Sequence, residues 1–179
     1  MKKFLKGAII ILVIVLLFAA GSYFFLRYRY PLKYEDLVRK YSSEYVISED
    51  FVLGVIWTES RFREDARSGA GAIGLMQIMP STGEWIAGKV GIEGFTEEML
   101  YDPETNIRLG CWYLSYLSKK FEGDEIKIMA GYNAGPGNVD KWTENGALDL
   151  EDIAFPETRK YVERVDDAKK IYRLLYNIH

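Results

Sequence analysis

A run of twenty uncharged residues near the N-terminus, from Gly7 to Leu26, constrains the fold of this chain more than any other feature. It consists mostly of Ile, Leu, Val, Phe and Ala. A helix of this length, rising about 1.5 Å per residue, just spans a bilayer core of about 30 Å. The cations and aromatic rings of residues 27–30 follow directly, as is typical of a membrane interface. We therefore predict a membrane anchor over residues 1–29 and a separate domain over residues 30–179.

A cleaved signal peptide is the alternative to this anchor. Signal peptides have a shorter apolar region, of about 7–15 residues, which ends in small residues at the cleavage site. Residues 19–22 (Ala-Ala-Gly-Ser) provide such small residues, but the apolar run continues beyond them to Leu26. The pattern favours an uncleaved anchor. Its orientation is not decided by charge, because similar numbers of basic residues flank the two ends: Lys2, Lys3 and Lys6 on one side, Arg27, Arg29 and Lys33 on the other.

Composition excludes several classes of function for the domain. Without the basic residues that flank the apolar run at positions 2, 3, 6, 27 and 29, 18 basic and 26 acidic side chains remain, a net charge of −8. Nucleic acid is therefore not an expected partner, because it requires a basic face. The single Cys and the single His, His179 at the last position, do not form a Cys/His metal cluster or a His-dependent nucleophile. We expect no metal and no cofactor, and any proton transfer would fall to carboxylates, Tyr or Lys.

Apolar periodicity predicts a mainly α domain of five to eight helices, with no convincing strand pattern. Four helices have clear start signals, with first residues at Glu49, Pro103, Glu125 and Pro156 after Ser48, Asp102, Asp124 and Phe155. The Gly-, Asn- and Pro-rich segments 63–80, 88–96 and 133–156 predict loops or short helical turns. Cys111 lies in the apolar stripe of the helix that begins at Pro103, so we expect a core residue rather than a reactive thiol.

Glu59 is the most unusual residue of the domain, because it ends the apolar stripe of Val52, Val55 and Ile56. Burial disfavours the ionised carboxylate and would keep this group protonated near neutral pH, as a general acid requires. The stretch that follows, 68–80, has too many glycines for a helix and too many apolar residues for a solvated loop. We expect its backbone to pack closely and to leave Gln77 as an amide that can orient a ligand. A structural buried Glu beside a Gly-rich turn explains the same pattern, so the residues alone leave both interpretations open.

Two further clusters carry polar side chains at helix ends. Tyr132 and Asn133 precede the Gly-Pro-Gly of residues 135–137, which would place a hydroxyl and an amide at the rim of a cleft. Taken alone, this pattern is more often a plain helix-terminating turn. Glu157 and Tyr161 are four residues apart and therefore share a helix face. A solvated first turn explains Glu157 equally well.

Together the three clusters resemble the SLT-type lytic transglycosylases, which have the goose-type lysozyme fold and belong to glycoside hydrolase family 23. The matching motifs are a Glu-Ser pair leading into Gly-Leu-Met-Gln-Ile-Met-Pro, then Tyr-Asn-Ala-Gly-Pro-Gly, then Glu-Thr-Arg-x-Tyr-Val. They occur in family order over roughly residues 45–175. The resemblance implies a lysozyme-like fold and an enzyme that cleaves the MurNAc-GlcNAc β-1,4 bond of peptidoglycan without water, to give 1,6-anhydro-MurNAc ends.

The resemblance also implies roles for individual residues. Glu59 matches the single catalytic residue, acting first as acid and then as base. The positions that match the family's substrate-binding residues are Ser68, Met76, Gln77 and Met79 in the cleft around Glu59, Tyr132 and Asn133 on the opposite lobe, and Glu157 and Tyr161 on the C-terminal helix. The Tyr132 hydroxyl is expected close to the catalytic carboxyl. One departure is Ala154 before Phe155, where the family more often has Pro, which changes a loop contact only.

Two other functions remain open at this stage. A hydrolytic muramidase would use water in the same site, and a non-catalytic, membrane-tethered glycan-binding module would hold the strand without turnover. Because peptidoglycan lies outside the cytoplasmic membrane, we expect a single-pass membrane protein with residues 1–6 inside and the catalytic domain extracytoplasmic. Its expected partners are glycan strands, the membrane through the N-terminal helix, and a cell-wall or envelope-machine protein that restrains it.

Overall fold

The computed structural model describes residues 2–143 and 148–178 and divides into two compact units, residues 1–32 and 33–179. The only His of the chain, His179, lies outside the described residues. The first unit is one helix, α1 (Lys2–Arg29). Its segment Phe4–Arg29 is long and apolar enough to cross a membrane, by length and composition. The roles that we assign to the two units stay predictions.

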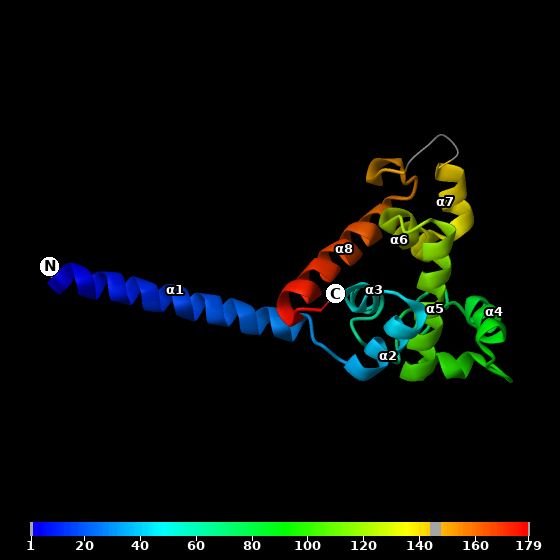
Figure 1. Cartoon of the computed structure of the whole chain (residues 1–179), viewed down its shortest axis with the longest axis horizontal. Helices are drawn as coiled ribbons and strands as arrows, with labels where there is room; N and C mark the ends of the chain where they lie inside the picture. Colours follow the sequence, from blue (N-terminus) through cyan, green and yellow to red (C-terminus); the bar gives the residue numbers. More distant parts are fainter. Residues whose placement is uncertain (1, 144–147, 179) are drawn as a thin grey trace. The chain divides into compact units, whose positions relative to one another are not determined.

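Helices are the regular secondary structure of the second unit among its described residues, and irregular loops join them (Figure 1). Its α-helices are α2 (Glu35–Tyr45), α3 (Glu49–Glu59), α4 (Pro80–Val90), α5 (Pro103–Lys120), α6 (Glu125–Ala134), α7 (Pro136–Trp142) and α8 (Pro156–Tyr176). Two short 3-10 helices, η1 (Glu97–Tyr101) and η2 (Leu150–Asp152), complete it. Extended pairing among the described residues is limited to two isolated bridges, Arg67–Ile73 and Ile73–Ile78. The mainly α fold and the number of helices agree with the prediction.

Three helices of this unit begin where the sequence predicts an N-terminal cap. The Asp102 carboxylate accepts a hydrogen bond of 2.8 Å from the backbone N–H of Thr105, and so caps α5 as predicted. Asp124 caps α6 in the same way, through the N–H of Lys127 at 3.2 Å. Ser48 does occupy the N-cap position of α3, but its side chain makes no capping bond. The position of that helix was therefore predicted correctly, while the capping contact was not.

Two segments that were predicted as loops or short helical turns, because they are rich in glycine, contain longer helical stretches. α4 continues into segment 88–96 as far as Val90 and ends at Gly91, whose φ of 72° is easily adopted by glycine. Within segment 133–156, α6 continues to Ala134 and α7 then begins at Pro136. Gly135, with φ of 86°, makes a break of a single residue, and Pro136 is well suited to the first position of the new helix.

The core is built around the pairing of α3 with α8, the most extensive helix contact in the domain (Figure 1). Gly54 makes this close approach feasible, because a Cβ there would lie 3.1 Å from the carbonyl oxygen of Val165. α5 contributes a second buried stripe, in which Cys111 is fully buried, as predicted. The α3–α8 pairing fixes the C-terminal end of α3, where Glu59 lies.

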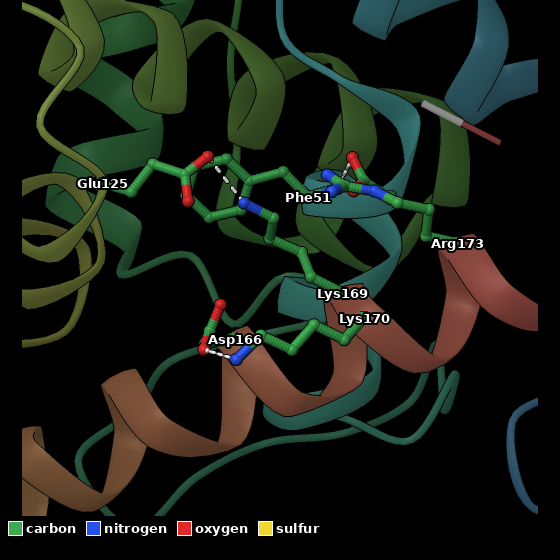
Figure 2. A network of polar contacts seen from close by, with 7 residues as sticks. Phe51, Glu125, Asp166, Lys169, Lys170 and Arg173 are labelled. Carbon is green, nitrogen blue, oxygen red and sulfur yellow. Dashed lines mark hydrogen bonds and ion pairs between the residues drawn. The ribbon is translucent and has the colours of Figure 1, made fainter.

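A polar network fastens α8 to α3 and α6 from the side (Figure 2). Arg173 donates two hydrogen bonds, of 2.6 and 3.0 Å, to the fully buried carboxylate of Asp50. One helical turn earlier, the ammonium of Lys169 contacts Glu125 at 2.6 Å and lies 4.9 Å from the centroid of the Phe51 ring. Buried charges are tolerated here because each has a partner of opposite sign.

Candidate active site

Glu59 is the last residue of α3, and the helix buries Val55 and Ile56 just before it. The residue as a whole is half-buried, and its carboxyl group lies toward the buried side. Burial raises the pKa of Glu59 to about 7, although a hydrogen bond from Tyr161 and the charge of Arg164 act in the opposite direction. Near neutral pH this carboxyl exists in both forms, so it can donate a proton and then accept one.

Tyr161, on the first turns of α8, faces this carboxyl. Its ring is buried and its hydroxyl interacts with Glu59. No other described residue forms a hydrogen bond with this hydroxyl, so Glu59 is its partner. Burial, and then the charge of Glu59, raise the pKa of Tyr161 well above its usual value. Tyr161 is therefore a neutral hydroxyl donor at physiological pH.

The Gly-rich loop that follows Glu59 is held by the side chains of Ser60, just after α3, and of Tyr132 on α6. The hydroxyl of Ser60 donates to the carbonyl of Leu75 at 2.8 Å, and the hydroxyl of Tyr132 donates to the carbonyl of Met76 at 2.9 Å. The loop also closes on itself through paired backbone bonds of 3.0 Å between Ile73 and Ile78. The packed backbone that the composition predicts is therefore present, and it joins the first and second motifs through Tyr132.

Asn106, fully buried on α5, is the central support of this loop. Its amide nitrogen donates to the carbonyls of Ile73 and Leu100 at 2.9 and 2.7 Å, and its amide oxygen accepts from the N–H of Met76 at 2.7 Å. Only glycine fits opposite it: Gly74 has a φ of 80°, and a Cβ there would lie 2.3 Å from the Asn106 amide nitrogen. Asn106 was not among the predicted site residues, although a lone amide on the buried side of a predicted helix is a usable signal.

Gln77 presents less of its amide to a ligand than expected. Its amide nitrogen donates to the backbone carbonyls of Ala66 and Gly74 at 3.1 and 2.9 Å. These two bonds use both amide hydrogens, so only the Oε1 oxygen remains to accept from a ligand. Gln77 can therefore recognise an N–H or O–H group, but it cannot act as a donor in this arrangement.

A pocket of about 240 Å³ opens beside the loop. It is lined by Gln77, Ile78, Met79, Thr82, Tyr113, Tyr132, Asn133, Ala134 and Gly135. Four residues predicted to bind substrate are thus brought together: Gln77, Met79, Tyr132 and Asn133. Tyr113 and Thr82 also line it, and the sequence analysis did not identify either. Burial and the charge of Glu59 both raise the pKa of Tyr132, which places this pocket within the electrostatic reach of the carboxyl.

The remaining predicted residues lie outside the pocket lining. The Met76 side chain is fully buried against Gly110, and its backbone bonds to Asn106 and Tyr132. Ser68 shapes a turn by accepting from the N–H of Ala72 at 2.9 Å. Glu157 is exposed at the start of α8. The expected short distance between the Tyr132 hydroxyl and Glu59 stays a prediction, since that hydroxyl donates to Met76 here.

The second and third motifs meet through Asn133. Its amide oxygen accepts a hydrogen bond of 2.8 Å from the hydroxyl of Thr158, which is buried on α8. This contact fixes the amide plane and leaves the NH₂ group of Asn133 for a ligand. All three motifs are therefore connected through Tyr132 and Asn133, which both line the pocket. Glu59 is not among the lining residues of the pocket, and its carboxyl has a pKa near neutrality.

Comparison with known proteins identifies relatives of this arrangement. A family model described as Transglycosylase SLT domain matches residues 36–151. The soluble lytic murein transglycosylase of Escherichia coli K12 is 40% identical over 152 residues, which cover 81% of this chain and 24% of that protein. The membrane-bound lytic murein transglycosylase C of Histophilus somni is 32% identical over 171 residues, covering 81% of this chain and 47% of that protein. This chain thus spans about a quarter to a half of the length of these relatives.

Solved structures agree with the sequence relatives. An inactive mutant of the lytic transglycosylase Slt from Pseudomonas aeruginosa matches with a TM-score of 0.80 and 35% identity, over 85% of this chain and 26% of that one. The 70-kDa soluble lytic transglycosylase from Escherichia coli matches with a TM-score of 0.79 and 39% identity, over 83% of this chain and 25% of that one. These matches confirm the lysozyme-like fold that the motifs predict. Because the family model covers more than half of the chain, this chain belongs to the transglycosylase SLT domain family.

Proposed function

We propose that this chain is a lytic transglycosylase that cleaves the MurNAc-GlcNAc β-1,4 bond of peptidoglycan, with Glu59 as its single acid and base. The observation that carries the proposal is the carboxyl of Glu59, whose pKa burial raises to about 7. Membership of the SLT family supports the reaction class, since relatives over this region are named lytic murein transglycosylases.

The proposed reaction uses the two forms of one carboxyl in turn. Neutral Glu59 protonates the glycosidic oxygen as the bond to C1 of the muramic acid breaks, and the N-acetyl group of that sugar stabilises the positive charge. Ionised Glu59 then removes the proton of the C6 hydroxyl, which attacks C1 to close the 1,6-anhydro ring. Because the nucleophile belongs to the substrate, the reaction avoids much of the entropic cost of a second molecule. The neutral hydroxyl of Tyr161 stabilises the carboxylate between the two steps.

Other residues would position the glycan. The Oε1 oxygen of Gln77 can accept from a sugar hydroxyl or acetamido N–H, and the NH₂ group of Asn133 can donate to a sugar oxygen. Met79, which is partly exposed at the pocket, offers an apolar contact to a sugar face. A hydrolytic muramidase needs the same groups, with water in place of the C6 hydroxyl.

We also propose that α1 anchors the enzyme to the cytoplasmic membrane, with the second unit on the outer side. The length and apolar composition of Phe4–Arg29 support the anchor. A relative named as membrane-bound supports membrane association in general. The location of peptidoglycan outside the membrane supports the orientation.

The full-length chain in detergent micelles, incubated with purified peptidoglycan, provides the test. Mass spectrometry should detect muropeptides that are lighter than the hydrated products by one water. Glu59→Gln should keep glycan binding and lose activity by about 100-fold or more, the contribution of a general acid. Glu163→Gln, an exposed carboxylate on α8, is the matched control and should retain activity.

Three results would contradict the proposal in different ways. Hydrated, reducing products would identify a muramidase. Retention of glycan without release by the wild-type chain would favour a binding module. Turnover by Glu59→Gln near the wild-type rate would remove Glu59 from the mechanism.

A further inference from the structure

Four aromatic side chains on α4 and α5 form one connected surface, which we call the aromatic platform: Trp85, Trp112, Tyr113 and Tyr116. Trp112 and Tyr116 stack with a ring-centroid distance of 5.7 Å and an interplanar angle of 3°. Trp85 meets both rings edge-on at 5.2 Å. α4 packs beside α5 here (Figure 1), so the arrangement combines two helices rather than the turns of one.

The platform is continuous with the candidate active site through Tyr113. This ring lies 6.1 Å from that of Tyr116 and 5.4 Å from that of Tyr132. Tyr113 and Tyr132 both line the 240 Å³ pocket. A series of aromatic contacts therefore leads from the pocket to Trp85, and a ligand that leaves the pocket on this side meets the platform next.

The platform is accessible and its polar atoms are available. The side chain of Trp85 is 40% exposed, and the other three are half-buried. Throughout the described part of the chain, no protein group accepts a hydrogen bond from either indole N–H or from the hydroxyls of Tyr113 and Tyr116. Burial raises the pKa of Tyr113 to about 12, so this hydroxyl stays neutral. Flat apolar rings with donors at their edges match the apolar face and polar rim of a pyranose sugar.

We propose that the aromatic platform binds a second part of the same glycan strand, with an N-acetylhexosamine ring stacked on Trp85 while the reacting sugars occupy the site at Glu59. This inference rests on the proposed function for its substrate class, but it does not require cleavage. Aromatic stacking needs no positive charge, which suits a domain whose net charge is −8 beyond the flanks of the apolar run. The platform would hold long strands more tightly than short ones.

A titration that varies ligand length tests the platform. The full-length chain carrying Glu59→Gln, in detergent micelles, is titrated with β-1,4-linked N-acetylglucosamine dimer and hexamer, and Trp85→Ala is then added. We expect hexamer affinity to fall by about tenfold, the usual scale for an exposed aromatic anchor, and dimer affinity to stay unchanged. The unchanged dimer affinity also reports that the variant is folded. Trp85→Phe, which keeps a ring for stacking and packing, should retain most of the hexamer affinity.

Tyr45→Ala is the matched control, because Tyr45 belongs to a stacked pair with Tyr41 on α2 that is separate from the pocket. It should leave both affinities unchanged. The platform is wrong if Trp85→Ala binds hexamer normally, if Trp85→Ala weakens dimer and hexamer equally, or if the Glu59→Gln chain binds no hexamer. It is also wrong if lipids carrying a bromine quencher in vesicles quench Trp85 fluorescence, because the rings would then face a membrane. If Trp85→Ala weakens hexamer binding only, and the wild-type chain releases no muropeptide, the platform is supported and only the cleavage proposal is overturned.

Discussion

At the scale of single residues, the pKa of Glu59 should set the alkaline limit of activity. The protonated form donates to the glycosidic oxygen, so kcat/KM should fall as pH rises through about 7. The Tyr161 hydroxyl lowers this pKa by stabilising the carboxylate. Tyr161→Phe should therefore raise the pKa of Glu59 and move the alkaline limb to higher pH. Arg164→Gln should move it in the same direction but less, because the Arg164 charge has the smaller effect.

A pH–kcat/KM profile on soluble glycan strands measures these shifts. A limb that moves to lower pH in Tyr161→Phe would contradict the assigned contact. A uniform loss at every pH, with the limb unmoved, would mean that Tyr161 acts only in packing.

Some side-chain environments in the candidate site could be predicted from local sequence patterns, and others could not. The burial of the Glu59 carboxyl could be predicted because a carboxyl at the end of an apolar stripe violates a strong local pattern. Its catalytic role stays a prediction. The hydrogen bonds of the Gln77 amide could not be predicted, since they depend on carbonyls of Ala66 and Gly74 that reach the amide only in the folded loop. Its role in substrate binding stays a prediction. Asn106 contacts residues 6 to 33 positions away, and no local pattern contains that information.

At the scale of helices, the ion pair between α3 and α8 should be asymmetric in its effect on stability. Asp50 is fully buried, whereas the Arg173 side chain is 52% exposed. Arg173→Met would leave a buried carboxylate without its partner and should cost about 3 kcal/mol of unfolding free energy. Asp50→Asn would leave an arginine that can turn to water and should cost only about 1 kcal/mol. Urea unfolding of the full-length chain, followed by Trp fluorescence, measures both values.

The neighbouring pair on α8, Lys170 with Asp166, is the matched control (Figure 2). Lys170 is exposed and Asp166 is half-buried, so neither charge is fully removed from water, and Lys170→Met should change stability by less than about 0.5 kcal/mol. The double variant of Asp50→Asn with Arg173→Met should recover part of the loss caused by Arg173→Met alone. Equal costs for the two single changes would show that the carboxylate is solvated rather than buried.

Helices were predictable in proportion to the strength of their capping signals. α5 and α6 have Asp caps, and their starts were predicted at the observed residues. α2 begins after Tyr34, which has a φ of 55° and no capping side chain, and the sequence gives no start signal there. α7 was not predicted as a separate helix, because a Gly-Pro-Gly sequence usually ends a helix. Here a single glycine separates two helices.

At the scale of the whole molecule, one apolar helix and one folded domain should give the enzyme a fixed place in the envelope. The second unit can act on peptidoglycan only if it lies on the outer side of the membrane. This depends on orientation, which the balanced charges around α1 leave undecided. Orientation is therefore the property of the whole chain that most needs measurement.

Thiol labelling can measure this orientation, because the single cysteine of the wild-type chain should not react and the wild-type chain therefore serves as the negative control. Cys111 is fully buried, and burial raises the pKa of its thiol far above the usual range, so the reactive thiolate is scarce. A membrane-impermeant maleimide should therefore leave the wild-type chain unlabelled. Leu174→Cys adds a thiol at a position of α8 that is 81% exposed, and intact cells should label it. Lys6→Cys should react only after the membrane is permeabilised. Labelling of Lys6→Cys on intact cells, with Leu174→Cys protected, would place the domain in the cytoplasm, where it could not reach the wall.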